Sequence, residues 1–340
     1  MNVPQTINTS LLETHLLNLT KEKLIEYLIC LEDALLKYSE SPSIIPPRIV
    51  ETTKKNKNTL FFMPVVDDTF SGIKILHNNS AKNSGFNGSI LLIDPNQGSV
   101  KYILEAGVIT GFRTALASCI GLYREYITSL TEKKDTFVIS VFGTGSQAFW
   151  HILLSCKLLQ DLCDKIIIQV FYRNSKLNCE EKIKEILNSS GTGNAKIQFV
   201  HHKLEDSFKI HCSDVIFGCL PSTEPNILYK YLESENDSML YISLIGSYKH
   251  FMKECDDHLI NYVLVESAGK IIVDSKEHTL LEAGELINVR KDQLVEIGQL
   301  KTCDKKEILG NPKKRKIILC KIVGLAIMDV AVSKKIVTDI

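Results

Sequence analysis

The sequence predicts an α/β fold in which a doubly wound parallel sheet is joined to a second domain of mixed α+β structure. In the middle of the chain, short apolar runs alternate with helical or polar segments, as in a parallel sheet covered by helices. The N-terminal part combines a long helix with short strands, and a last helix can return to it. We therefore expect a domain of residues 1–128 completed by 320–340, and a second domain of residues 129–319.

The N-terminal domain begins with an amphipathic helix over residues 20–38. Thr20 can cap this helix, and Leu24, Leu28, Leu31 and Leu35 recur at helical spacing. Strands of this domain are expected at 59–65, 72–76 and 89–93, followed by a helix at 105–127. The parallel sheet is expected to contain strands at 137–142, 165–171, 196–200, 214–219, 239–245, 262–265 and 271–274. A strand at 316–320 and a helix at 323–335 end the chain.

Composition favours a cytoplasmic protein that binds neither nucleic acid nor a membrane. The 340 residues contain 40 Lys+Arg and 40 Asp+Glu, so the formal net charge is zero. The sequence shows no secretory signal and no uncharged apolar run of about 18 residues.

No metal site is expected. The ten cysteines are scattered, without a Cys-x-x-Cys pair, and His201-His202 has no partner at ligand spacing. The basic run Lys313–Lys316 resembles a nuclear-import segment, but a solvated loop is favoured.

Residues 137–148 combine a buried strand with the turn Gly143-Thr144-Gly145-Ser146-Gln147-Ala148. Glycine at 143 permits a tight turn, and glycine at 145 lets a pyrophosphate reach the first N–H groups of the next helix. An amphipathic helix and a second strand follow, as a Rossmann-type unit requires. The sequence thus predicts a dinucleotide site, with a βα unit that binds no ligand as the alternative.

The end of the second strand favours NADP(H) over NAD(H). A carboxylate here would bind the ribose 2′-OH, but the chain has Arg173-Asn174-Ser175. An arginine can pair with a 2′-phosphate and stack on adenine. A solvated arginine is the alternative, and NAD(H) then remains open.

Several motifs occur in the order seen in one family. They are Pro46-Pro47-Arg48, Gly72-Ile73-Lys74, Gly111–Ser118, the turn at 143–148, Val273-Asp274-Ser275, Glu282-Ala283-Gly284-Glu285 and Lys321–Val330. Over residues 44–340 the chain resembles the ornithine cyclodeaminase/mu-crystallin family. The resemblance implies a homodimer in which a Rossmann domain binds NAD(P) and the other domain serves for dimerisation and binds a small amino-acid or imino-acid substrate.

The resemblance also assigns roles to individual residues. Arg48 and Arg113 match the arginines that hold the substrate carboxylate, Lys74 matches the lysine beside the reacting carbon and nitrogen, and Glu282 is assigned to substrate binding. The residues expected to bind the cofactor are Gly143, Thr144, Gly145, Ser146, Gln147, Arg173, Asn174, Cys219, Leu220 and Gly246.

Two departures from the family pattern bear on the reaction. Tyr248 stands where cyclodeaminases have a catalytic aspartate, and Ile322 replaces the serine of a Lys-Ser-Val-Gly motif. Reduction of a preformed C=N bond needs only a hydride and a proton donor, for which Lys74 and Tyr248 are the candidates. We expect an NAD(P)H-dependent oxidoreductase that reduces a small carboxylated imine, similar to a ketimine reductase. The alternatives are an NAD-dependent cyclodeaminase or dehydrogenase, and a dinucleotide-binding protein that has lost turnover.

Overall fold

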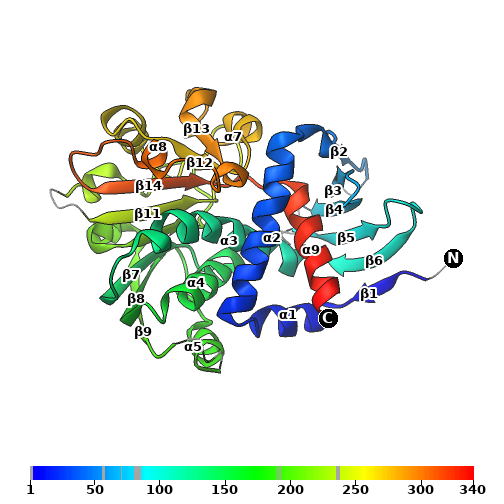
Figure 1. The fold of residues 1–340 in the computed structure, drawn as a ribbon, viewed down its shortest axis with the longest axis horizontal. Helices are drawn as coiled ribbons and strands as arrows, with labels where there is room; N and C mark the ends of the chain where they lie inside the picture. The colour runs from blue at the N-terminus through cyan, green and yellow to red at the C-terminus, as the bar shows by residue number, and fades with distance from the viewer. Residues whose placement is uncertain are drawn as a thin grey trace. The chain divides into compact units, whose positions relative to one another are not determined.

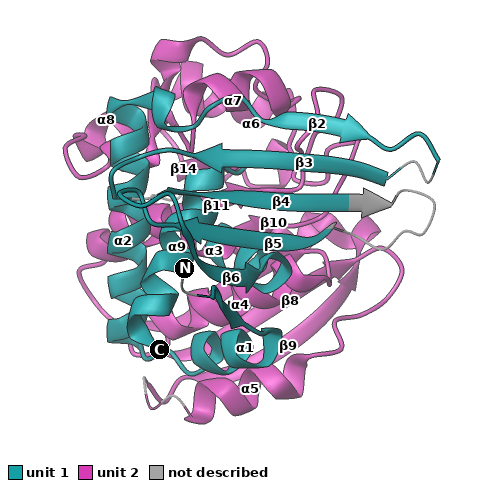
Figure 2. Ribbon diagram, turned by 90° about the vertical axis from the view of Figure 1, so that its right-hand side faces the viewer, with its two compact units in different colours: residues 1–114, 324–340 teal, residues 115–323 magenta. Residues whose placement is uncertain are grey.

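The computed structural model describes residues 3–55, 58–69, 71–79, 86–189, 191, 193–234 and 238–340. The chain divides into unit 1, residues 1–114 and 324–340, and unit 2, residues 115–323 (Figure 2). The first boundary of this division lies inside helix α3 (Ala106–Gly121), and the domain boundaries expected from the sequence, 128/129 and 319/320, stay predictions. The second half of this helix belongs to unit 2, where the Tyr241 hydroxyl donates a hydrogen bond to the Ser118 carbonyl.

Unit 1 contains a mixed sheet in the order β1-β6-β5-β4-β3-β2, in which β1 and β6 pair in parallel and the other neighbours are antiparallel. The strands are β1 (Gln5–Ile7), β2 (Ile49–Thr52), β3 (Asn58–Val65), β4 (Ser71–Asn79), β5 (Phe86–Ile93) and β6 (Val100–Glu105). The expected strands at 59–65, 72–76 and 89–93 are confirmed as β3, β4 and β5.

The helices of unit 1 come from both ends of the chain. They are α1 (Thr9–Leu17), α2 (Lys21–Glu40), a 3-10 turn (Pro42–Ile44), the start of α3, and α9 (Ala326–Asp339). The Thr20 side chain caps α2 by accepting from the Lys23 amide, which confirms the expected helix start. Helix α9 runs beside α2 (Figure 1) and packs on β3, β4 and β5. The C-terminal segment therefore completes the core of unit 1.

Unit 2 is a doubly wound parallel sheet in the order β13-β12-β14-β11-β10-β7-β8-β9, which confirms the expected fold class. Its strands are β7 (Lys134–Phe142), β8 (Cys163–Tyr172), β9 (Lys196–Lys203), β10 (Val215–Gly218), β11 (Met239–Leu244), β12 (Ile271–Val273), β13 (Leu294–Glu296) and β14 (Lys316–Lys321). Its α-helices are the end of α3, α4 (Ser146–Leu159), α5 (Glu180–Ser189), α6 (Asp257–Asn261), α7 (Lys276–Glu282) and α8 (Lys305–Leu309). Short π or 3-10 segments lie at Leu122–Tyr126, Ile127–Ser129, Leu204–Cys212, Tyr229–Tyr231, Tyr262–Glu266, Lys291–Gln293 and Ile297–Gln299.

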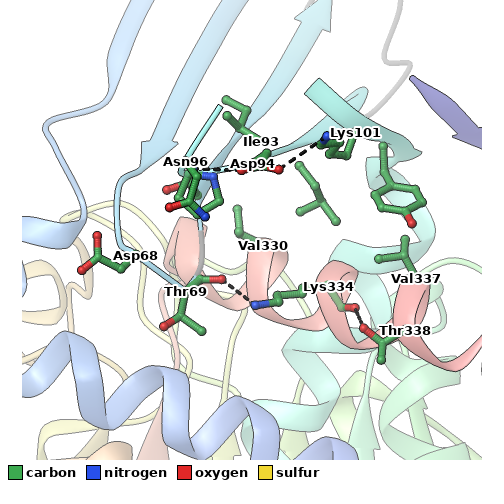
Figure 3. Close-up of a pocket in the computed structure, with 14 residues that line it drawn as sticks. Asp68, Thr69, Ile93, Asp94, Asn96, Lys101, Val330, Lys334, Val337 and Thr338 are labelled. Carbon is green, nitrogen blue, oxygen red and sulfur yellow. Dashed lines mark hydrogen bonds and ion pairs between the residues drawn. The ribbon is translucent and has the colours of Figure 1, made fainter. Parts of the chain in front are cut away.

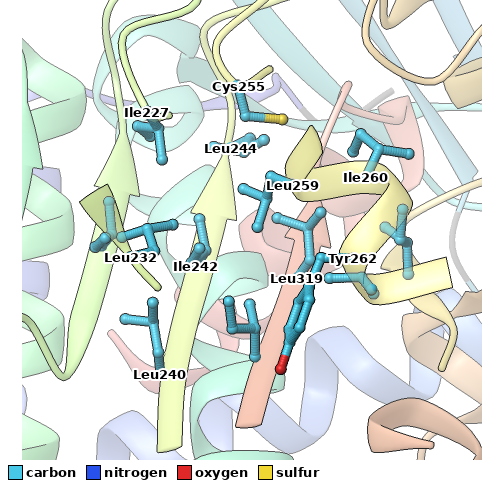
Figure 4. Packing of buried hydrophobic residues seen from close by; sticks show 14 of the residues in the cluster. Ile227, Leu232, Leu240, Ile242, Leu244, Cys255, Leu259, Ile260, Tyr262 and Leu319 are labelled. Carbon is cyan, nitrogen blue, oxygen red and sulfur yellow. The ribbon is translucent and has the colours of Figure 1, made fainter. Parts of the chain in front are cut away.

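Strand β11 shows how both faces of this sheet are covered. Its alternate residues Leu240, Ile242 and Leu244 enter an apolar cluster to which α6 and β14 also contribute (Figure 4). The side chains between them point to the opposite face of the sheet. There the Ser243 hydroxyl donates to the Ser118 hydroxyl of α3 at 2.9 Å. Burial on both faces produces the nearly continuous apolar runs by which the sequence reveals these strands.

The strand expected at 262–265 is wrong. Asp256 caps α6, and the chain continues from this helix as a π-helical segment in which Tyr262 and Val263 are buried. A four-residue apolar run does not distinguish a strand from a buried helical turn, so the capped helix before it decides the structure.

Among the described residues, one helical stretch, Ala106–Ser129, is long and apolar enough to cross a membrane by length and composition alone. Of its most apolar window, 78% is buried inside the fold, which is the environment of a core helix.

Candidate functional site

The turn after β7 is shaped to receive an anion. Gly143 has a φ of +119°, and its amide donates to the Phe171 carbonyl at the end of β8 at 2.9 Å. Among the described residues no side chain caps α4, and a Cβ atom at Gly145 would meet nothing within 4 Å. The first turn of α4 therefore offers N–H groups and open space, which suits a dinucleotide phosphate.

Three loops meet at this edge of the sheet. A Cβ atom at Gly143 would lie 3.0 Å from the Cys219 carbonyl oxygen, and one at Gly246 would lie 2.3 Å from the Leu220 carbonyl oxygen. The loops after β7, β10 and β11 are thus in direct contact. The structure brings together Gly143, Cys219, Leu220 and Gly246, four of the residues expected to bind the cofactor.

Arg173 and Asn174 follow β8, which pairs with β7. Both residues are exposed, and the run Arg173-Asn174-Ser175 carries no carboxylate. The Gly143 turn is joined to the end of this strand by its bond to Phe171. An exposed guanidinium here can meet the adenosine end of a dinucleotide that lies on the turn.

Unit 1 carries a second cluster, in which two cations share one carboxylate. Lys74 of β4 donates to Oδ1 of Asp329 on α9 at 2.7 Å and to the Thr110 hydroxyl of α3 at 2.8 Å. Nε of Arg113 on α3 donates to the same Oδ1 atom at 3.3 Å. All three charged side chains are buried. The structure thus brings together Lys74 and Arg113, which lie far apart in the sequence.

This cation cluster, Lys74, Arg113 and Asp329, contains two positive charges for one negative charge. Burial lowers the pKa of Lys74 to about 8; Asp329 and, more weakly, Glu105 oppose this shift, and the nearby Arg113 adds to it. A buried cation without full compensation is costly, so a second anion is favoured beside these groups. A substrate carboxylate would supply that charge.

Gly324 leaves room for the Arg113 guanidinium. It has a φ of +97° just before α9, and a Cβ atom there would lie 3.1 Å from Nη1 of Arg113. Nη1 also donates to the sulfur of Met328 at 3.4 Å. The guanidinium is therefore fixed between the start of α9 and the Asp329 carboxylate.

Asp329 is the member of this cluster that the sequence interpretation missed. It is completely buried, and its Oδ2 atom has no hydrogen-bond partner in the described chain. A single carboxylate within the apolar run Ile327-Met328-Asp329-Val330-Ala331 is a signal that could have revealed it. Buried carboxylates are rare unless they are paired, so such a residue implies a cation nearby.

The other expected site residues lie as follows. Arg48 is exposed and precedes β2 in unit 1, and Glu282 is the half-buried last residue of α7 in unit 2. Tyr248 is 41% exposed and lies two residues after Gly246. Ile322 is buried after β14, so this position presents no polar group. Roles for Arg48, Glu282 and Tyr248 stay predictions.

Comparison with known proteins decides the relationship. The model of the ornithine cyclodeaminase/mu-crystallin family matches residues 11–340. The chain belongs to this family.

Two relatives and one solved structure illustrate the range of this family. The chain is 41% identical to the uncharacterized protein YGL159W of Saccharomyces cerevisiae, over 94% of this chain and 92% of the relative. It is 26% identical to a Delta(1)-pyrroline-2-carboxylate reductase of Bacillus thuringiensis, over 88% of this chain and 87% of that enzyme. A structure of the Delta(1)-pyrroline-2-carboxylate reductase of Thermococcus litoralis, in complex with NADH and L-proline, shares the fold with a TM-score of 0.71 and 22% identity, covering 98% of this chain and 96% of that chain.

The basic run at 313–316 is only partly the solvated loop that we expected. Lys313 is exposed, but Arg315 is buried, and its guanidinium donates to the Ser213 carbonyl. Lys314 pairs with Glu233. Arg315 donates hydrogen bonds to backbone carbonyl groups, one of which, that of Ser213, lies just before strand β10. Part of the basic run therefore stabilises the fold.

Two further features lie outside the family motifs. In the described part of the chain, no three His, Cys, Asp or Glu side chains converge as a metal site. A pocket of about 420 Å³ opens in unit 1 between α9 and the β5–β6 turn (Figure 3). Its lining includes Lys101, Tyr102 and Lys334 but neither Lys74 nor Arg113. We therefore do not assign the substrate to this pocket.

Proposed function

We propose that this protein is an NAD(P)H-dependent oxidoreductase that reduces a small carboxylated imine. The observation that carries the proposal is the cation cluster, in which Lys74 and Arg113 are buried on one carboxylate. The names of two relatives, both pyrroline-2-carboxylate reductases, support a cyclic imino acid as the substrate class. Such a substrate combines the carboxylate that Arg113 would bind with a C=N bond.

The described residues of unit 2 fit a nicotinamide dinucleotide, which would supply the hydride. The turn from Gly143 to Gln147 would hold the pyrophosphate on the N–H groups of α4. Arg173 would pair with a 2′-phosphate, which supports a preference for NADP(H) over NAD(H). The loops after β10 and β11 would border the bound cofactor, because they meet beside Gly143.

The residues of unit 1 would orient the imine and supply its proton. Arg113 would hold the substrate carboxylate with its guanidinium fork, together with Arg48. Addition of hydride would form a C–H bond at the imine carbon and break the C=N π bond. The electron pair of that bond would move to nitrogen, which would take a proton and form an N–H bond. Lys74 suits this step because its lowered pKa leaves a proton that transfers readily near neutral pH. Asp329 and Thr110 would hold the Lys74 ammonium in place.

Cyclisation of ornithine with loss of ammonia is less favoured. The loop after β11 carries Tyr248, and a phenol, unlike a carboxylate, brings no negative charge to the position. Buried Ile322 removes a polar group as well. These same substitutions favour a second candidate, a dinucleotide-binding protein without turnover.

A homodimer is part of the proposal. Strand β2 forms one edge of the unit 1 sheet, and its side chains Ile49 and Val50 are 57% and 46% exposed. A second copy could cover this apolar edge. Native mass spectrometry of the purified protein would show the dimer and any nucleotide that stays bound to it.

The direct test is NADPH or NADH oxidation with a panel of cyclic imino acids, including a pyrroline-2-carboxylate. We expect turnover of at least one member and no ammonia from ornithine. Proline and ammonia formed from ornithine would contradict the proposed reaction. Tight dinucleotide binding without turnover of any imine would favour the binding protein instead.

A further inference from the structure

A buried ionic network lies beneath the loop that follows β11. The network consists of Glu254, Glu285 and Lys321, and the β11 loop is defined here as residues 245–248. Lys321 at the end of β14 lies 3.1 Å from Glu254 and 3.3 Å from Glu285. Relative exposures are 0% for Lys321, 3% for Glu254 and 5% for Glu285. None of these residues is assigned above to substrate or cofactor.

The network binds the β11 loop through both its backbone and its side chains. The amides of Gly246 and Ser247 donate to Oε2 of Glu254 at 2.7 and 3.1 Å. The Ser247 hydroxyl donates to Glu285 at 2.6 Å and accepts from Lys321. Two consecutive amides and one hydroxyl of the loop are therefore held by charged partners, which form stronger bonds than neutral ones.

The Glu254 carboxylate also touches the backbone of two strand ends. A Cβ atom at Gly218, the last residue of β10, would lie 2.4 Å from Oε1 of Glu254, and one at Gly246 would lie 2.7 Å from it. Gly246 in turn packs on the Leu220 carbonyl, in the loop that also contacts Gly143. A shift of Glu254 would thus be passed on to the edge where the dinucleotide is expected.

With both carboxyl groups ionised, the network carries one excess negative charge. Two carboxylates face one ammonium, and Oε1 of Glu254 has no hydrogen-bond partner in the described chain. Burial raises the pKa of Glu254 to about 7, with Lys321 opposing this shift and Glu285 adding to it. Buried ion pairs contribute little net stability compared with apolar residues of similar size, because their desolvation is costly. A role in fixing the geometry of the loop accounts for their presence better than stability does.

We propose that Glu254, Glu285 and Lys321 are positioning residues that fix the β11 loop for dinucleotide binding. The inference rests on the proposed function only in that Gly246 borders the cofactor. Reduction of an imine is not needed to test it.

The first measurement is amide hydrogen exchange of the protein without ligand, compared among variants. In Glu254→Ala, we expect exchange in peptides that cover residues 245–249 to rise about tenfold or more, because two amides lose their shared acceptor. Peptides from β7 and α4 should be unchanged. Glu254→Gln should restore protection, since its amide oxygen can accept the same two bonds. Glu307→Gln, which removes a carboxylate paired with Lys270 at the surface of unit 2, is the control.

The second measurement is the affinity for NADPH and NADH by fluorescence titration. We expect the dissociation constant to rise about tenfold or more in Glu254→Ala and to stay within about threefold of the unaltered protein in Glu254→Gln and Glu307→Gln. Ser247→Ala is a milder variant that removes the hydroxyl between Lys321 and Glu285 without burying a new charge. If Glu254→Ala does not fold, Ser247→Ala takes its place as the test. We expect Ser247→Ala to weaken dinucleotide binding.

The outcomes separate this inference from the proposed function. Unchanged exchange at 245–249, or unchanged dinucleotide affinity, in a folded Glu254→Ala or Ser247→Ala protein would overturn the inference. Exchange that rises equally everywhere would also overturn it, because that result indicates loss of stability alone. An unaltered protein that binds dinucleotide but reduces no imine rejects the proposed reaction and leaves the positioning role intact.

Discussion

Lys74 is the residue from which the proposed reaction takes its proton. With a pKa lowered to about 8 by burial, its ammonium should be present below this pH and lost above it. We expect kcat/KM for imine reduction to be level below a pH of about 8 and to fall about tenfold per pH unit above it. Lys74→Met should lower kcat/KM by about 10²–10⁴-fold and leave NADPH affinity unchanged.

Lys101→Met is a suitable control for Lys74, because Lys101 pairs with Asp94 elsewhere in unit 1. A Lys74→Met protein that keeps the pH profile of the unaltered enzyme would assign the proton to another group. Tyr248→Phe then tests the phenol as that donor.

Arg113 should discriminate by shape as well as by charge. In Arg113→Lys the positive charge remains, but an ammonium cannot form the two parallel hydrogen bonds of a guanidinium. We expect KM for the imino acid to rise about tenfold or more, with dinucleotide affinity unaltered. Steady-state kinetics should show no change for Arg290→Lys, an exposed arginine of unit 2. Unaltered kcat/KM in Arg113→Lys would show that Arg113 does not hold the carboxylate.

Arg173 should set the preference between the two dinucleotides. We expect the unaltered protein to bind NADPH more tightly than NADH, and Arg173→Ala to remove the difference. The loss of one charged contact to phosphate is about 1.5–3 kcal/mol, or roughly ten- to hundredfold in affinity. Fluorescence titration measures both affinities. The affinity for NADH is the internal control, because NADH has no 2′-phosphate and Arg173→Ala should leave its binding unchanged. Equal affinities before mutation would refute the assignment.

At the scale of an element, the start of α9 positions the cation cluster. Gly324 combines a φ of +97° with close approach to Arg113, so Gly324→Ala should displace the guanidinium. We expect weaker binding of the imino acid, measured as a higher KM, while dinucleotide affinity stays the same. Gly98→Ala is the matched control, because Gly98 also has a positive φ of 64° but a Cβ atom there meets nothing within 4 Å. Equal effects of the two substitutions would indicate backbone strain alone.

Helix α3 is an element that the sequence predicts, although the contacts of its individual residues cannot be predicted from the same pattern. Its small and apolar residues predict a buried helix, and the structure confirms one. Nothing in that pattern shows that Arg113 faces Asp329, whereas Ser118 bonds to Tyr241. These partners come from segments remote in sequence, and helical periodicity reports only which face is buried.

At the scale of the whole molecule, His151 should make stability depend on pH. It is buried in α4, bonded to the Gln147 carbonyl and the Ser118 hydroxyl. Burial lowers its pKa from 6.5 to about 4, against the effect of the Gln147 bond. Between these pH values the unfolded chain binds more protons than the folded chain. The contribution of His151 to the free energy of unfolding should therefore be complete above a pH of about 6.5 and decrease as the pH falls to about 4. The loss is on the order of 3 kcal/mol.

Urea denaturation at several pH values tests this dependence, with His151→Gln as the comparison. Glu254 acts in the opposite direction, since its pKa is raised from 4.5 to about 7 and folding then binds a proton. The difference between the unaltered protein and His151→Gln isolates the histidine. The same slope in both proteins would contradict a neutral buried His151.

The sequence by itself determined the fold class, the family and the glycine turn between β7 and α4. Buried parallel strands appear as apolar runs, and a strand-turn-helix with glycines at 143 and 145 follows from local backbone constraints. It also placed Lys74 and Arg113 among the expected site residues, through motifs that occur in the family's order. Each of these features is carried by neighbouring residues or by their order along the chain.

Only the tertiary structure decided which charges are buried together. Three groupings show it: Asp329 with Lys74 and Arg113, Lys321 with Glu254 and Glu285, and Arg315 with backbone carbonyl groups. In the sequence these residues are charges in apolar helices, in strands, in loops or in a basic run, and most such residues are solvated. Packing brings remote segments together and removes water, and this desolvation lowers the pKa of Lys74 and raises that of Glu254.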